Sequence, residues 1–106
     1  MELNNLSSFL GLMQRSGNIT YGETLIEEIR KNKVFVTLIA SDIGEASKKK
    51  IVDKCTFYHI PYFIVLDKQC LSNSIGKGNV SAIGVRSIGG ANKIINMLKG
   101  VLNDER

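Results

Sequence analysis

A run of seven residues at positions 34–40, "VFVTLIA", is apolar everywhere except at Thr37. Most of its residues are β-branched or aromatic, and such residues favour strands. A strand that is apolar on both faces has other elements over both faces, and in α/β folds these are helices. The run therefore predicts a central strand of a layered sheet whose two faces are both covered.

Helical and strand patterns alternate on both sides of this run. Apolar residues recur at helical spacing in 6–13, 25–29, 51–58, 71–75 and 94–102, and shorter, largely apolar runs at 62–66 and 80–85 indicate further strands. Residues 18–20 could form a very short strand as well. The run at 62–66 is expected to be covered on both faces as well. Thr20 with Glu23, and Asp42 with Glu45, fit the capping box that begins a helix. Gly17 and Gly76 stand where helices would end.

This alternation predicts a three-layer α/β/α sandwich formed by one domain, residues 1–106. Because crossovers through helices join parallel neighbours, the sheet is expected to be small, mixed and mostly parallel. A domain of this size buries about two thirds of its unfolded surface, which is enough for a core without disulfides or metals.

Composition bears on the surroundings of the protein. The formal net charge of +4 favours a polyanionic partner such as nucleic acid, although a solvated surface alone can carry the same bias. The N-terminal segment lacks the basic start and long apolar run of a signal peptide or membrane span. The two cysteines form no zinc or disulfide pattern and suit a reducing compartment. We therefore expect a cytoplasmic protein with no membrane partner.

Few residues could carry catalysis. The single histidine, His59, follows Cys55 by four residues, so the two could form a nucleophile pair or half of a metal site. A third group is not evident, and a buried thiol near a surface imidazole is the simpler interpretation. Cys70 lies near the start of the fourth helix, where the pKa of a thiol can fall, although an incidental role is again simpler. We expect no enzyme, no cofactor and no small-molecule substrate.

Basic residues gather in two places. Lys48–Lys50 and Lys54 form a stripe on the third helix, which could meet a polyanion or could be a solvated face. Lys77 lies between glycines in "GKGN", where backbone and side chain could both approach a phosphate, or could simply form a soluble turn. The glycines of "SIGGANK", residues 87–93, could hold an anion at a helix start or form a tight turn.

Four segments that span most of the chain share the order and character of one protein family, namely "FLGLMQRSGNITYGE", "VTLIASD", "KKKIVDKCTFYHIPY" and "LSNSIGK". They resemble the opening, the central strand, the third helix and the fourth helix of the kink-turn-binding ribosomal protein superfamily, the ribosomal protein L-seven-Ae family. The small bacterial YlxQ-type members are the most similar. The resemblance implies a sandwich fold, no catalysis, and binding of structured, kink-turn-like RNA in a ribonucleoprotein, with the ribosome as a candidate partner.

The resemblance also implies two RNA-binding elements. The first is the start of the second helix, where the family reads guanines of sheared G·A pairs, here at Thr20, Gly22, Glu23 and Thr24. The second is the loop after the fourth helix, where a small apolar residue packs under a flipped-out base, here at Lys77, Gly78, Asn79 and Val80.

The second helix departs from the family pattern. The family asparagine is absent, and Glu27 or Glu28 replaces the family lysine. Glu23 is then either a reader of guanine or only a helix cap, with Glu27 and Glu28 solvated. Two hypotheses follow, an RNA-binding protein or a protein-interaction module on the same fold that no longer binds RNA.

Overall fold

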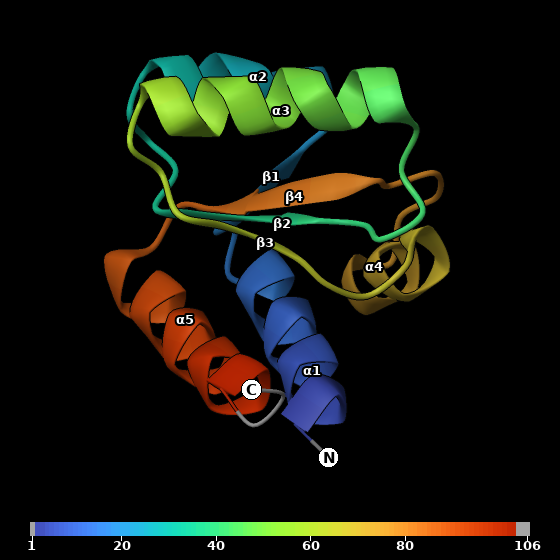
Figure 1. Cartoon of the computed structure of the whole chain (residues 1–106). Helices are drawn as coiled ribbons and strands as arrows, with labels where there is room; N and C mark the ends of the chain where they lie inside the picture. Colours follow the sequence, from blue (N-terminus) through green and yellow to red (C-terminus); the bar gives the residue numbers. More distant parts are fainter. Residues whose placement is uncertain (1, 104–106) are drawn as a thin grey trace.

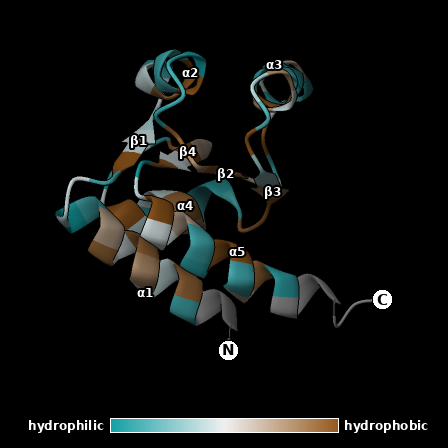
Figure 2. Ribbon diagram, turned by 90° about the vertical axis from the view of Figure 1, so that its left-hand side faces the viewer, coloured by the Kyte–Doolittle hydropathy of each residue, from teal (hydrophilic) through white to brown (hydrophobic). Residues whose placement is uncertain are grey.

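The computed structural model describes residues 2–103, with side-chain surroundings for residues 5–99. The elements follow the order α1 (Glu2–Arg15), β1 (Ile19–Tyr21), α2 (Glu23–Arg30), β2 (Val36–Ile39), α3 (Glu45–Phe57), β3 (Tyr62–Ile64), α4 (Lys68–Ile75), β4 (Ala82–Val85) and α5 (Ile88–Asn103). Helices α2 and α3 cover one face of the sheet, and α1, α4 and α5 lie against the other (Figures 1 and 2). The predicted three-layer α/β/α sandwich is confirmed.

The sheet has the strand order β1-β4-β2-β3. β2 and β3 are parallel, whereas β4 runs antiparallel to both of its neighbours, β1 and β2. The sheet is therefore mixed, as predicted, but the expectation that it is mostly parallel was wrong. The cause is α4, which lies at one end of the sheet and does not run back along it, so β4 starts at the end where β3 finishes (Figure 1).

Two apolar cores lie on the two faces of the sheet. Alternate residues of β2 and β4 point to opposite faces, as the period of a strand requires. Val36, Leu38, Ile83 and Val85 belong to the larger core under α1, α4 and α5. The smaller core joins α2 and α3 to the sheet through Leu25, Ile29, Val34, Ile39, Ile51, Cys55, Ile60 and Ala82. The central strands are thus covered on both sides, as the apolar run at 34–40 predicts.

β3 differs from the expectation that it would be covered on both faces. Tyr62 is 36% exposed and Ile64 is 41% exposed. β3 is the edge strand beside β2, so only one of its sides has a neighbouring strand. An apolar run shows that a segment favours a strand but does not show whether that strand lies at an edge, so this prediction was wrong.

Both predicted capping boxes are also wrong. Thr20 lies within β1 and is 2% exposed, and α2 starts after Gly22, whose φ of 69° favours glycine. Gly44 stands at the N-cap of α3 without a side-chain cap. The Asp42 carboxylate instead accepts a hydrogen bond of 2.9 Å from the backbone N–H of Lys68 at the start of α4. Local spacing fits a cap in both cases, but the Thr20 hydroxyl is buried in β1 without a hydrogen-bond partner, and Asp42 binds the start of α4.

Gly84 allows α2 to lie close to the centre of the sheet. It pairs with Thr20 on β1 and with Thr37 on β2, on the face that α2 and α3 cover. A Cβ atom at this position would meet Leu25 Cδ1 at 2.6 Å and Val34 Cγ1 at 2.9 Å. Both atoms belong to the core between α2 and the sheet, so a side chain at position 84 would push α2 outward.

We therefore expect Gly84→Ala to lower the free energy of unfolding by about 1 to 3 kcal/mol, the cost of overpacking a core. Gly89→Ala is the matched control, because a Cβ there meets only Ser87 Oγ at 4.0 Å in the first turn of α5. The control should be neutral or more stable by up to about 1 kcal/mol. Urea titrations would measure both, and equal stability of the two variants would contradict the close packing of α2.

Candidate nucleic-acid interface

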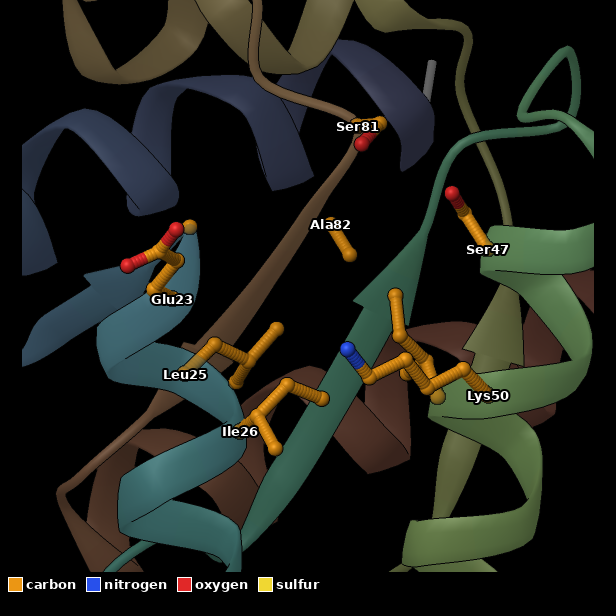
Figure 3. Close-up of a pocket in the computed structure, with 9 residues that line it drawn as sticks. Glu23, Leu25, Ile26, Ser47, Lys50, Ser81 and Ala82 are labelled. Atoms are coloured by element: carbon orange, nitrogen blue, oxygen red, sulfur yellow. The ribbon is translucent and has the colours of Figure 1, made fainter.

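Helices α2 and α3 begin at the end of the sheet where β4 begins (Figure 1). Between these starts lies a groove of about 440 Å³. Residues from all three elements line it, namely Gly22, Glu23, Leu25, Ile26, Ser47, Lys50, Ile51, Ser81 and Ala82. We call this cavity the α2–α3 groove, and Figure 3 shows its lining side chains.

The α2–α3 groove has an apolar floor and a polar rim. Leu25, Ile51 and Ala82 are buried at its base. Glu23, Ser47 and Lys50 are exposed around it. In Figure 3 the ammonium end of Lys50 extends from α3 toward α2, while Glu23 lies at the start of α2. The groove therefore offers a carboxylate acceptor and a cationic donor beside the partly exposed apolar side chain of Ile26.

Glu23 and Thr24, the two predicted readers on α2, face different cavities. Glu23 lines the α2–α3 groove. Thr24 lines a depression of about 260 Å³ on the other side of α2, together with Ile19, Thr20, Tyr21 and Arg86. Consecutive residues of a helix lie about 100° apart, which explains the separation. Of the two, only Glu23 shares a cavity with the start of β4.

The loop before β4 leads directly into the groove. After Gly76, the backbone N–H of Lys77 donates to the Ser72 carbonyl at 3.0 Å, and Ser72 Oγ accepts from the N–H of Val80 at 2.9 Å. These bonds fix both ends of the loop to α4. Lys77, Gly78 and Asn79 are exposed between them. Ser81 and Ala82, which follow Val80 in the chain, line the groove, whereas Lys77, Gly78, Asn79 and Val80 do not. The loop therefore lies next to the groove in the chain without forming part of its lining.

Two of the predicted site residues are buried. Thr20 and Val80 are each 2% exposed, and Val80 belongs to the larger core. The Val80 side chain therefore offers no surface for a flipped-out base while the loop keeps this conformation, which corrects the role expected for it. Its structural role is to anchor the loop. The exposed members of the predicted set are Gly22, Glu23, Thr24, Lys77, Gly78 and Asn79.

Two of the three acidic residues of α2, Glu27 and Glu28, have ion-pair partners. Arg86, at the end of β4, donates from Nε to Glu28 Oε1 at 2.7 Å, and the Glu28 side chain is only 17% exposed. Glu28 is therefore not solvated, contrary to the simple expectation. Glu27 pairs with Lys31 at 3.8 Å, one helical turn away, and both side chains are exposed. Sequence reasoning missed Arg86, since no local signal links residues 58 positions apart.

The cysteines and the histidine lie in different surroundings. Cys55 is fully buried under α3, as predicted, and burial raises the pKa of its thiol against a smaller lowering by the Thr37 hydroxyl. His59 is exposed just past the end of α3. Cys70 is exposed, and the Asp67 side chain raises the pKa of its thiol, the opposite of the fall considered for a helix start. Cys55 and His59 therefore do not share a surface site.

Among residues 5–99, whose side chains the structure describes, no cluster of three or more His, Cys, Asp or Glu side chains could hold a metal ion. No helix within residues 2–103 has the length and apolar character needed to cross a membrane.

The chain is similar to known proteins over most of its length. A family model described as the ribosomal protein L7Ae/L30e/S12e/Gadd45 family matches residues 4–95. The protein described as RNA-binding protein YlxQ in Bacillus subtilis (strain 168) is 38% identical over 90 residues, 84% of this chain and 90% of that protein. The protein of the same description in Enterococcus faecium is 32% identical over 94 residues, 88% of this chain and 90% of that protein.

Two solved structures are similar in fold. A Bacillus halodurans protein of unknown function superposes with a TM-score of 0.84 at 33% identity, over 88% of this chain and 95% of that one. The Giardia lamblia 15.5kD RNA binding protein superposes with a TM-score of 0.77, over 96% of this chain and 88% of that one. At 13% sequence identity, this superposition shows a shared fold and nothing more.

The two thiols should react at very different rates with a maleimide under native conditions. Because the thiolate is the reactive form, buried Cys55 with its raised pKa should label slowly and exposed Cys70 first. Asp67→Asn should speed labelling of Cys70 several-fold near pH 8, because removing the carboxylate lowers the raised pKa while the amide can still cap α4. Mass spectrometry of labelled peptides separates the sites, and native labelling of Cys55 as fast as in urea would contradict its burial.

Proposed function

This chain belongs to the ribosomal protein L7Ae/L30e/S12e/Gadd45 family, and we propose that it is an RNA-binding protein without enzymatic activity. The observation that carries the proposal is the α2–α3 groove, where Gly22 and Glu23 meet the start of β4 that follows the Lys77 loop. The two relatives described as RNA-binding proteins, of which this chain covers 90%, support it. The proposed partner is structured RNA in the bacterial cytoplasm, with kink-turn-like and ribosomal RNA as the finer candidates.

In this proposal some residues at and beside the groove read bases, and others bind phosphates. The Glu23 carboxylate accepts hydrogen bonds from the N–H groups of an exposed guanine, and bonds to a charged group are worth about 1.5 to 3 kcal/mol. Lys77, Lys50 and the backbone amide of Gly78 meet phosphates, which position the RNA without reading its sequence. The partly exposed apolar side chain of Ile26 lines the groove, where an unstacked base could pack, the kind of base that proteins recognise in RNA.

Phosphate repulsion from α2 is smaller than the sequence suggests. The guanidinium of Arg86 offsets the charge of Glu28, and Lys31 partly offsets that of Glu27. Exposed ion pairs are screened by salt, so the pair between Glu27 and Lys31 contributes little to stability. The acidic sequence of α2 is therefore compatible with a bound RNA, which favours RNA binding over a module that has lost it.

We expect Lys77→Ala to weaken binding to every structured RNA and to reduce the slope of log affinity against log salt by about 0.7 to 0.9, the loss of one phosphate contact. Glu23→Ala should instead reduce the preference for a kink-turn RNA over a plain duplex. Thr24→Ala is the matched control, because Thr24 lies outside the groove, and it should change neither quantity. Fluorescence anisotropy titrations of both RNAs at several salt concentrations measure these effects.

The outcomes separate the two hypotheses. Wild-type binding of both RNAs that is weak and independent of salt would favour a protein-interaction module. If Thr24→Ala loses the preference for the kink-turn RNA over the duplex and Glu23→Ala keeps it, the residues that read the RNA lie in the depression beside Arg86.

Substitutions of Glu27 and Glu28 should have different effects on RNA affinity and on the free energy of unfolding. Glu27→Lys should raise the affinity for RNA and leave the free energy of unfolding within about 0.5 kcal/mol, because its side chain is exposed. Glu28→Lys should destabilise the fold, since it places a second cation against Arg86 in a pocket where the native side chain is 17% exposed. Urea denaturation with anisotropy distinguishes the two, and equal stabilities would contradict a structural role for the pair between Glu28 and Arg86.

A further inference from the structure

Phe57, at the end of α3, is 73% exposed, which is more than any other large apolar side chain in the part of the chain that the structure describes. It lines a cavity of about 550 Å³ with Lys50, Asp53, Lys54 and Tyr58. Lys50, Lys54 and Phe57 recur at helical spacing and form one stripe about 10 Å long. We call Lys50, Lys54, Phe57 and Tyr58 the α3 platform.

The aromatic ring of the platform has a supported orientation. Phe57 and Tyr58 form an edge-to-face pair with centroids 4.8 Å apart and planes at 80°. Edge-to-face packing is a favoured arrangement of aromatic rings, and it restricts the motion of an otherwise exposed side chain. A ring that is held in place and open to solvent loses little conformational entropy when a flat group stacks on it.

The charge around the ring is positive. Asp53, the one acidic residue lining this cavity, forms an ion pair of 3.4 Å with Lys49. Within the described residues, Lys50 and Lys54 form no ion pair. Interface cores between proteins are depleted of lysine, whereas an aromatic ring beside cations is how proteins bind single-stranded nucleic acid. The chemistry of the platform therefore suits a polyanion with planar bases.

The platform also continues the groove described above. Lys50 lines both the α2–α3 groove and the platform cavity. A single-stranded RNA that leaves the groove past Lys50 would follow α3 toward Phe57, away from the loop before β4.

We propose that the α3 platform binds an unpaired RNA strand, with one base stacked on Phe57 and its phosphates against Lys50 and Lys54. This inference rests on the proposed RNA-binding function and adds a second contact that recognises single-stranded RNA next to the structured element.

The test uses two probes, an eight-nucleotide uridine homopolymer and a blunt-ended kink-turn RNA, with binding measured by anisotropy. Phe57→Ala and Phe57→Leu should weaken binding of the homopolymer by about 5-fold to 100-fold, the range given by the loss of about 1 to 3 kcal/mol of stacking. Phe57→Trp should keep it. The leucine variant retains an apolar side chain, so its loss of affinity would report stacking. Ile88→Ala, at an exposed apolar position on α5, is the control and should bind normally.

Salt dependence tests the lysines separately. Lys50→Ala with Lys54→Ala should lower the salt slope for the homopolymer by about 0.7 for each lysine. Lys99→Ala, which removes the same charge from the opposite layer, should leave the slope unchanged. Photocrosslinking of a 4-thiouridine-substituted homopolymer should place the crosslink on the peptide that contains Phe57.

Each outcome decides the inference. Homopolymer binding by Phe57→Leu at the wild-type level, or a crosslink elsewhere, would overturn the platform and leave Phe57 as a protein contact. Kink-turn binding should change less than about 2-fold in the Phe57 variants and should fall in Lys77→Ala. A wild-type protein that binds the kink-turn but not the homopolymer would refute this inference alone, whereas one that binds neither would refute the proposed function as well.

Discussion

Helix α2 lies against the centre of the sheet because Gly84 has no side chain there. Leu25 and Val34 occupy the space that a Cβ atom would take, so the height of α2 above β4 is set by this contact. The α2–α3 groove depends on that height, since α2 and β4 each contribute one wall of it. Because the interior is close-packed, a methyl group at position 84 would have to displace Leu25 or Val34.

The reversed strand β4 brings the two candidate RNA-binding segments together. β4 lies between β1 and β2 and runs antiparallel to both, so its first residues lie beside the last residues of β1. The start of α2 follows β1, and the Lys77 loop precedes β4. Segments that are about 55 residues apart in the chain therefore meet at one end of the sheet. In an entirely parallel sheet, β4 would start at the other end, so the loop before it would lie at the end of the sheet opposite to the start of α2.

Tertiary ion pairs explain how a basic protein carries an acidic helix next to its candidate RNA-binding groove. Arg86 holds Glu28 at 2.7 Å and also reaches the Gly17 carbonyl at 3.4 Å, so this charge pair ties α2 to β4 and to the turn after α1. The lysines of α3 lie on the other side of the groove. Glu28 is thus paired away from the groove, while Lys50 lines the groove and Lys77 is exposed in the loop before β4.

The helices, the strands, the layered class of the fold and the buried position of Cys55 could all be predicted from the sequence, because side-chain periodicity and local propensity are properties of short segments. It also located both candidate RNA-binding segments, through a resemblance that spans the chain. Five features could be seen only in the folded chain. β3 is an edge strand, β4 is reversed, Thr20 and Asp42 do not cap helices, Thr24 faces away from Glu23, and Arg86 pairs with Glu28. Each of these features depends on which residues from distant parts of the chain become neighbours. The packing of the whole chain determines those neighbours, and a local sequence pattern contains no information about them.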